Sequence, residues 1–197
     1  MKIGIYGGSF NPVHKGHVHL ASEAAAKLGL DKVYFIPSKI SPHRSTAEYV
    51  PEKDRLAMLE IVCRSDERFE VSDYELRSDR VSYTIYTIEH FRRKFPGDEL
   101  YLLVGSDMLL MFDKWRSYDR ILEEAVLAVV SRQDGDIRQL EKKADELNYP
   151  GRIIICSTDA VEISSSEIRR NIRENVFDTC YLDENVVKYI KSNGLYR

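Results

Sequence analysis

Six short apolar runs alternate with longer segments of helical periodicity, and this alternation constrains the fold more than any other feature. The runs are mostly bounded by Gly, Pro, Asp or Ser, and they lie at 2–6, 33–36, 69–72, 100–104, 126–130 and 152–156. Such runs are typical of strands buried on both faces of a parallel sheet. Helical periods are found at about 17–28, 51–64, 83–94, 137–147, 165–173 and 183–192. The pattern predicts an α/β fold: a doubly wound, Rossmann-like parallel sheet with helices on both faces and a helical C-terminal portion.

Length and composition indicate one globular unit. The 197 residues are 43% hydrophobic and 31% charged, close to ordinary globular usage, which argues against disorder, collagen and coiled coil. We expect a single domain over 1–197, whose helical C-terminal part begins at about 160. The stretch 38–50 has little periodicity, and we expect it to be a long functional loop.

Cysteine usage and hydropathy bear on the location of the chain. Cys63, Cys156 and Cys180 are far apart, odd in number and without a CxxC pair, which indicates free thiols in a reducing cytoplasm. The first residues lead straight into a strand rather than a signal peptide. No apolar run approaches the roughly 20 residues that span a bilayer. We therefore expect a cytoplasmic protein with no membrane partner.

The charge of the chain is unevenly distributed. A formal net charge of −3 argues against binding to nucleic acid or membrane through bulk positive charge. Residues 1–45 nevertheless carry a formal charge of +4 and contain four of the five histidines. The sequence therefore predicts a local anion site near the N-terminus.

The segment that follows the first strand, residues 7–17, has the sequence GGSFNPVHKGH. In an open α/β sheet, ligands bind beyond the carboxyl ends of strands and at helix N-termini. The segment is neither a Walker A loop nor a GxGxxG fingerprint. His14 and His17 at the start of a helix could both aim donors at one anion. Alternatively, they could be solvated histidines beside a glycine turn, or, with weaker support, metal ligands.

A second segment, ISSSEIRR at 163–170, also opens a predicted helix. Its serines could provide a helix cap followed by a solvated basic face. They could instead form a second anion pocket with Arg169, because arginine is suited to bidentate phosphate binding.

Both segments resemble the nucleotidyltransferase superfamily that carries (H/T)xGH after its first strand and ISSTxIR near its end, with Ser166 here in place of threonine. Other segments are similar to those of bacterial nicotinate-nucleotide adenylyltransferases: 35–44 to the PxxxPPH[KR] loop (Ser41 replaces a proline), 80–84 to PSYT, 105–108 to G[AS]DM, and 187–196 to the C-terminal ending. Together these segments cover nearly the whole chain.

The resemblance implies a set of site residues. The catalytic ones would be His14, His17 and Arg169. ATP would contact Gly7, Gly8, Ser9, Phe10, His43, Arg44, Gly105, Asp107, Ile163, Ser164, Ser165 and Ser166. Nicotinate mononucleotide would contact Ser9, Thr84, Trp115, Arg116 and Arg132. Taken singly, several of these have ordinary structural explanations: Trp115 as core, Arg132 as a solvated side chain, Thr84 and Asp107 as parts of helix starts.

The same resemblance implies transfer of the adenylyl group of ATP to nicotinate mononucleotide, with release of pyrophosphate. Mg²⁺ would be carried by the ATP phosphates, because the sequence has no visible carboxylate cluster for a protein-bound metal. Thr84 and nearby amides would favour a carboxylate over an amide on the ring, and the motifs force no acidic residue there. The partners would be small molecules and not nucleic acid, and a homo-oligomer is compatible with the sequence.

Two other functions remain open. A phosphopantetheine adenylyltransferase, or another small-phosphate adenylyltransferase, shares the first motif, but the former is usually shorter, more often has Thr at the position of His14, and lacks the SYT and Trp features. A non-catalytic nucleotide-binding regulator would keep the pocket and lose turnover, yet no phosphate-contacting motif position is broken here. A basic nucleic-acid module is a third alternative with little support, since the positive stretch is confined to one end.

Overall fold

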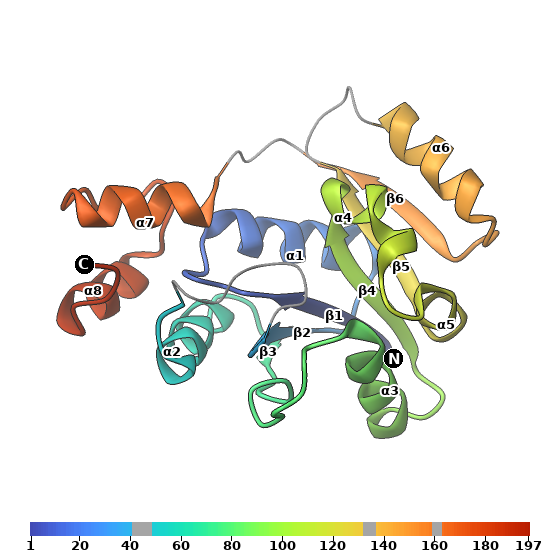
Figure 1. The fold of residues 1–197 in the computed structure, drawn as a ribbon, viewed down its shortest axis with the longest axis horizontal. Helices are drawn as coiled ribbons and strands as arrows, with labels where there is room; N and C mark the ends of the chain where they lie inside the picture. Colours follow the sequence, from blue (N-terminus) through green and yellow to red (C-terminus); the bar gives the residue numbers. More distant parts are fainter. Residues whose placement is uncertain (41–48, 132–136, 159–162) are drawn as a thin grey trace.

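The computed structural model describes residues 1–40, 49–131, 137–158 and 163–197 (Figure 1). The strands are β1 Lys2–Gly8, β2 Lys32–Pro37, β3 Phe69–Val71, β4 Glu99–Gly105, β5 Val126–Ser131 and β6 Ile153–Ser157. The helices are α1 Lys15–Leu28, α2 Glu52–Cys63, α3 Thr84–Lys94, α4 Ser106–Leu110, α5 Tyr118–Glu124, α6 Ile137–Leu147, α7 Ser165–Arg173 and α8 Glu184–Ser192, with a 3₁₀ turn η1 at Phe112–Lys114.

The described strands form one parallel sheet in the order β3-β2-β1-β4-β5-β6. In register, Ile5 of β1 lies between Tyr34 of β2 and Leu102 of β4. The chain therefore proceeds outward in one direction from β1 and then in the other from β4. Ligands of such sheets bind beyond the strand ends where the order reverses. The predicted doubly wound fold is confirmed, and it places the crevice between β1 and β4.

Two apolar layers cover the two faces of the sheet. In β1, Ile3 and Ile5 belong to the layer under α3, α5 and α6, whereas Tyr6 belongs to the layer under α1, α2, α7 and α8. This alternation along one strand is why the predicted runs are apolar at nearly every position. Because the strands have apolar side chains on both faces, both faces of the sheet must be covered by helices.

The C-terminal helices α7 and α8 lie together at one end of the molecule, next to α1 and α2 (Figure 1). Ile168 and Ile172 of α7 and Ile190 of α8 pack in the same apolar layer as Phe10. The backbone amide of Lys15, the first residue of α1, donates to the carbonyl of Tyr181 at 2.9 Å. The segment between α7 and α8 is thereby held against the start of α1.

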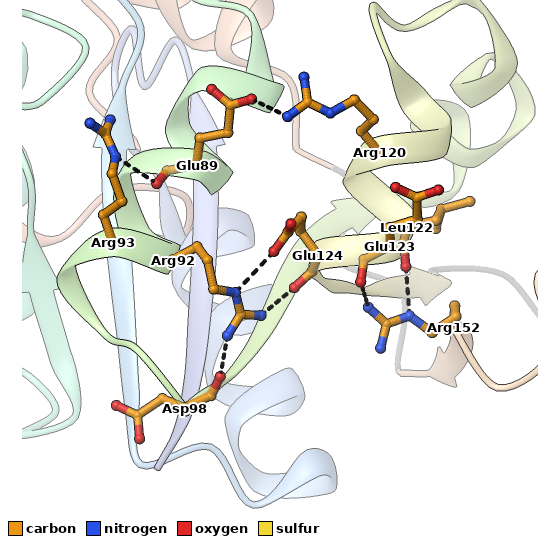
Figure 2. A network of polar contacts seen from close by, with 9 residues as sticks. All are labelled: Glu89, Arg92, Arg93, Asp98, Arg120, Leu122, Glu123, Glu124 and Arg152. Carbon is orange, nitrogen blue, oxygen red and sulfur yellow. Dashed lines mark hydrogen bonds and ion pairs between the residues drawn. The ribbon is translucent and has the colours of Figure 1, made fainter.

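Two arginines, Arg92 and Arg152, bind carbonyl groups near the amino ends of β4 and β6 (Figure 2). Arg92 of α3 donates to the carbonyl of Asp98 at 2.7 Å, to the carboxylate of Glu124 at 3.1 Å, and to the carbonyl of Glu124. Arg152 donates to the carbonyls of Leu122 and Glu123 at 2.5 and 2.6 Å. Both arginines therefore satisfy the carbonyls at the C-terminal end of α5, where cations are favoured.

Most predicted boundaries are within two residues of the observed ones, and two differences have a clear physical reason. Helix α1 begins at Lys15 rather than at about His17, because His14 has the extended backbone of an N-cap residue. Helix α5 was not predicted; its seven residues make less than two turns, too few for a clear period. Within the described residues, no helix is both long enough and apolar enough to cross a membrane.

Candidate functional site

The carboxyl ends of β1 and β4 meet at the crevice, and each ends in glycine. A Cβ atom added to Gly7 or Gly105 would meet no heavy atom within 4 Å, so both backbones face open space. A Cβ on Gly8 would instead lie 3.0–3.2 Å from the ring of Phe10. Phe10 is buried at φ 45°, with its ring edge-on to Tyr6 and His17. The glycines thus let a ligand approach the strand ends, and the folded-back Phe10 fixes the turn.

His14 and His17 stack on each other at the start of α1. Their ring centroids are 3.7 Å apart with planes inclined by 30°, and His14 is only 4% exposed. The backbone N–H of His14 donates to Nδ1 of His17 at 3.2 Å. Nδ1 of His17 is therefore an acceptor, and a neutral His17 ring would have its proton at Nε2, as a hydrogen-bond donor. The prediction of two adjacent imidazoles at a helix N-terminus agrees with this geometry.

Gly16 allows the stacked arrangement. A Cβ at position 16 would lie 3.1 Å from Nδ1 and 3.2 Å from Cε1 of His14, closer than ordinary van der Waals contact. It would also lie 3.8 Å from the Cβ of Ile163, just before α7. The glycine of the HxGH segment therefore provides room for the His14 ring between α1 and the second motif.

The second motif meets the first at the start of α7. Arg169 donates from Nη1 to the carbonyl of Asn11 at 3.0 Å and from Nη2 to Oγ of Ser166 at 3.3 Å. Ser165 donates to the carbonyl of Pro12 at 3.2 Å. Ser164 occupies the N-cap position without a side-chain capping bond, so capping alone does not account for the serines. Two segments about 150 residues apart in sequence are brought into direct contact.

On the other side of Gly7 lies a small cavity between β1, β4 and α3. It is lined by Ile5, Gly7, Glu75, Thr84, Thr87, Leu102, Leu103, Val104 and Trp115. Thr84 is the first residue of α3, and Trp115 follows η1 with its ring against Phe112 at 5.1 Å. Thr84 and Trp115, the two residues expected at the nicotinate ring, therefore border one cavity with Gly7 at the end of β1.

The remaining predicted residues are distributed around this crevice. Asp107 is exposed in the first turn of α4, directly after Gly105. The guanidinium of Arg116 lies over the rings of Tyr83 and Tyr86, 4.9 and 5.5 Å from their centroids. His43, Arg44 and Arg132 lie outside the described residues, as does most of the predicted loop at 38–50.

Sequence reasoning missed Arg55, a buried cation that contacts the turn after β1. It is 1% exposed, and its Nη1 donates to the carbonyl of Ser9 at 2.9 Å. Its guanidinium also lies 5.1 Å from the ring centroid of Tyr49. Burial lowers the pKa of Arg55 from its usual value. A signal existed: Arg55 falls in line with Leu59 and Val62 on the apolar face of its helix, where a charge is out of place.

Two uncharged contacts were missed as well. Oδ1 of buried Asn11 accepts from the backbone N–H of Val50 at 3.2 Å and from the hydroxyl of Tyr196 at 3.0 Å. The end of the chain therefore helps to hold the turn whose carbonyl binds Arg169. No local sequence pattern marks this contact, because its partners are 185 residues apart.

Sequence reasoning also missed Glu75, and the motifs did not lead us to expect an acidic group there. It is 7% exposed and lines the same cavity as Thr84 and Trp115. The hydroxyl of Thr87 donates to its Oε1 at 2.6 Å. Desolvation raises the pKa of Glu75, and hydrogen bonds from Thr87 and Ser82 partly oppose the shift. A buried carboxyl group that lines a cavity is a functional-site candidate.

No cluster of three or more His, Cys, Asp or Glu side chains suited to a metal ion is present among the residues that the structure describes. The cysteines Cys63, Cys156 and Cys180 are all free.

Comparisons with known proteins identify the family of the chain. The family model described as cytidylyltransferase-like matches residues 5–171. A probable nicotinate-nucleotide adenylyltransferase of Clostridium tetani is 37% identical over all of this chain and 99% of its own length. One from Neisseria gonorrhoeae is 36% identical, over 99% and 98%.

The fold is also that of a solved relative. A Plasmodium falciparum nicotinic acid mononucleotide adenylyltransferase, complexed with NaAD, superposes with a TM-score of 0.79 at 19% identity, covering 99% of this chain and 97% of that one. The resemblance inferred from the motifs is confirmed by the full-length relatives. The chain belongs to the nicotinate-nucleotide adenylyltransferase family of the cytidylyltransferase-like fold.

Proposed function

We propose that the crevice between β1 and β4 carries out the reaction of this family, with roles for the residues named above. An oxygen of the nicotinate mononucleotide phosphate attacks the α-phosphorus of ATP. The bond to the bridging oxygen of the β-phosphate breaks, and pyrophosphate leaves with the electron pair. The products are deamido-NAD and pyrophosphate. The observation that carries the proposal is that the turn after β1 contacts the second motif through Asn11 and, at Gly7, borders the cavity lined by Thr84 and Trp115.

The residues of the phosphate turn act by position and charge. The attacking phosphate oxygen is already ionised, so no side chain needs to accept a proton. Catalysis then consists of holding two anions in line and stabilising the charge that develops on pyrophosphate. We assign that role to His14, His17 and Arg169, together with the amides of residues 8–10. The Nε2–H donor of His17 supports this assignment.

The other predicted ATP contacts complete the nucleotide side. Ser164, Ser165 and Ser166, with Ile163, would line the start of α7 against the phosphates, and Gly105 and Asp107 would border the adenosine. His43 and Arg44 would close over the phosphates from the loop at 38–50.

The acceptor is assigned to the cavity beside Gly7, which we call the ring cavity. Thr84 would bind the ring carboxylate together with the amide of Arg116, and Trp115 would stack on the ring, with Ser9 and Arg132 near the phosphate. The cavity is about 40 Å³, room for ordered water rather than for an aromatic ring. Binding of a ring there therefore requires movement of the side chains at its mouth.

We propose further that Mg²⁺ enters on the triphosphate, held by phosphate oxygens and water. It would lower the charge that His17 and Arg169 must stabilise. We also propose that the chain works as one domain over 1–197 in the cytoplasm, on small molecules rather than nucleic acid; its free cysteines suit a reducing compartment.

The test is an acceptor panel. Pure protein with ATP and Mg²⁺ is given nicotinate mononucleotide, nicotinamide mononucleotide or phosphopantetheine, and pyrophosphate is followed. We expect the highest kcat/KM with nicotinate mononucleotide. If pyrophosphate is released only with phosphopantetheine, the proposed acceptor is wrong and phosphopantetheine is the acceptor. If ATP binds but no acceptor leads to release of pyrophosphate, the protein is a nucleotide-binding regulator.

A further inference from the structure

Glu75 places a carboxyl group where the acceptor's own carboxylate is proposed to bind. The group is buried in the lining of the ring cavity, in company with Thr84, Thr87 and Trp115. The hydroxyl of Thr87 holds it at 2.6 Å, so the carboxyl group is fixed in place. The phosphate-binding chemistry does not use it.

The groups that face Glu75 do not compensate a negative charge. Only the hydroxyls of Thr87 and Ser82 act on it among the described residues, and the contributions of β1 and β4 to the cavity are apolar or glycine. The cations on surrounding segments contact other groups: Arg77 pairs with Asp73, and Lys39 pairs with Asp79. Arg116 lies over the rings of Tyr83 and Tyr86, and His90 stacks on Tyr74. Asp107, on the neighbouring α4, is exposed.

Two carboxylates that share a desolvated site cannot both be ionised without a large cost in free energy. An acceptor carboxylate and an ionised Glu75 would be such a pair. A neutral Glu75 removes the repulsion and provides an O–H donor. A carboxamide has the opposite preference, because its NH₂ group can donate to an ionised Glu75.

We propose that Glu75 sets the choice between a ring carboxylate and a ring carboxamide, accepting a proton from solvent when the carboxylate binds and favouring the amide when ionised. This inference rests on the proposed function of the ring cavity. It assigns the acid-or-amide choice to a side chain that the sequence motifs did not contain.

The sign of the pH dependence follows directly. Below the pKa of Glu75 in the free protein, the group is already neutral and carboxylate binding does not depend on its titration. Above that pKa, a proton must be taken up, so kcat/KM for nicotinate mononucleotide falls tenfold per pH unit through Glu75 alone. Burial raises this pKa, which moves the fall toward neutral pH.

The matched variant is Glu75→Gln, which keeps the shape and an acceptor for Thr87 but cannot ionise. We expect kcat/KM for nicotinate mononucleotide in the variant to lack the tenfold fall per pH unit that wild type shows. Comparing the two proteins at each pH cancels the titration of the substrate's own phosphate. Asp79→Asn is the control, because this carboxylate lies in the same segment with its side chain 97% exposed; it should keep the wild-type profile.

Wild-type protein provides a second measurement that does not depend on the folding of a variant. Calorimetry in buffers of different ionisation enthalpy, with a non-hydrolysable ATP analogue present, counts protons taken up on binding. We expect uptake rising toward one proton with nicotinate mononucleotide above the pKa of Glu75, and none with nicotinamide mononucleotide.

The outcomes separate the two proposals. Pyrophosphate formation with the same pH profile in wild type and Glu75→Gln, or binding without proton uptake at any pH, would overturn the role of Glu75 and leave the reaction standing. No pyrophosphate from wild type with nicotinate mononucleotide at any pH would overturn the proposed function, and with it the inference.

Discussion

Arg92 at the amino end of the sheet and Arg55 at its carboxyl end differ in how completely their guanidinium groups are hydrogen-bonded. At the amino end, Arg92 donates to two carbonyls and a carboxylate of its own chain, as Figure 2 shows. At the carboxyl end, Arg55 donates to the carbonyl of Ser9, while its buried Nε has no hydrogen-bond partner among the described residues. Arg92 stabilises the C-terminal end of α5 through its hydrogen bonds. Arg55 places a buried positive charge next to a turn that is proposed to bind anions.

That contrast has a thermodynamic consequence. Removing a fully paired side chain leaves carbonyl groups without donors and lowers stability. Arg55 has no ion pair among the described residues, although the charge of Glu52 acts on it, so removing this buried cation relieves a desolvation cost instead. Substitutions at the amino end should therefore change the free energy of unfolding more than activity, and substitutions at the carboxyl end should do the reverse.

The largest effect is expected at the carboxyl end, for His17→Ala. If His17 donates to the leaving pyrophosphate as proposed, its loss should lower kcat by on the order of 100- to 1000-fold, as for other preorganised donors. The helix start retains its glycine and its neighbouring backbone, so the melting temperature should change by a few degrees at most. Steady-state pyrophosphate release and thermal unfolding measure the two. If the loss of activity is accompanied by a comparably large loss of thermal stability, His17 has a structural role and not the proposed catalytic one.

Arg92→Ala tests the amino end. It removes three hydrogen bonds, one of them also an ion pair, from the junction of α3, α5 and β4. We expect a free energy of unfolding lower by about 2 kcal/mol, measured by urea denaturation. kcat/KM of the folded protein should stay within about twofold of wild type. A clear drop in kcat/KM at full folding would show that the two ends of the sheet are coupled, contrary to the comparison.

Arg55→Met sharpens the comparison, because it removes the charge of a buried side chain while retaining much of its apolar volume. The carbonyl of Ser9 loses a donor, but the desolvation cost of the cation disappears. The two effects oppose each other, so the free energy of unfolding should change by less than about 1 kcal/mol. kcat/KM should fall about tenfold, mainly through KM for ATP. A destabilisation as large as that of Arg92→Ala would mean that Arg55 is structural like Arg92.

The sequence predicted what local patterns encode and missed what long-range contacts create. The strands follow from apolar runs, and the stacking of His14 and His17 follows from their spacing around Gly16. The contact between Arg169 and Asn11 could be anticipated only because each lies in a recognised motif. Glu75 faces the ring cavity because an irregular segment packs against α3, and no period in the sequence states which way such a segment turns.

Arg55 lies between these two cases. Its position on the apolar face of α2 was visible in the sequence, but its partner, the carbonyl of Ser9, is set by the packing of α2 against the turn after β1. A charge on an apolar helix face is therefore a usable signal for a buried functional cation. The identity of its partner requires the structure.

The smallest effect is expected for Tyr196→Phe, which removes one hydroxyl at the C-terminal end of the chain. Oδ1 of Asn11 keeps the amide of Val50 and loses its second donor, so we expect a loss of about 1 kcal/mol in the free energy of unfolding. Because the carbonyl of the same Asn11 binds Arg169, kcat/KM should also fall, by about two- to threefold. Tyr181→Phe, a partly exposed tyrosine of the same C-terminal part, serves as the control and should leave both quantities unchanged. Urea denaturation and initial rates test both variants. If Tyr196→Phe lowers stability without touching kcat/KM, the chain end supports the turn as a scaffold only, and the carboxyl end of the sheet, like the amino end, contains contacts that serve stability alone.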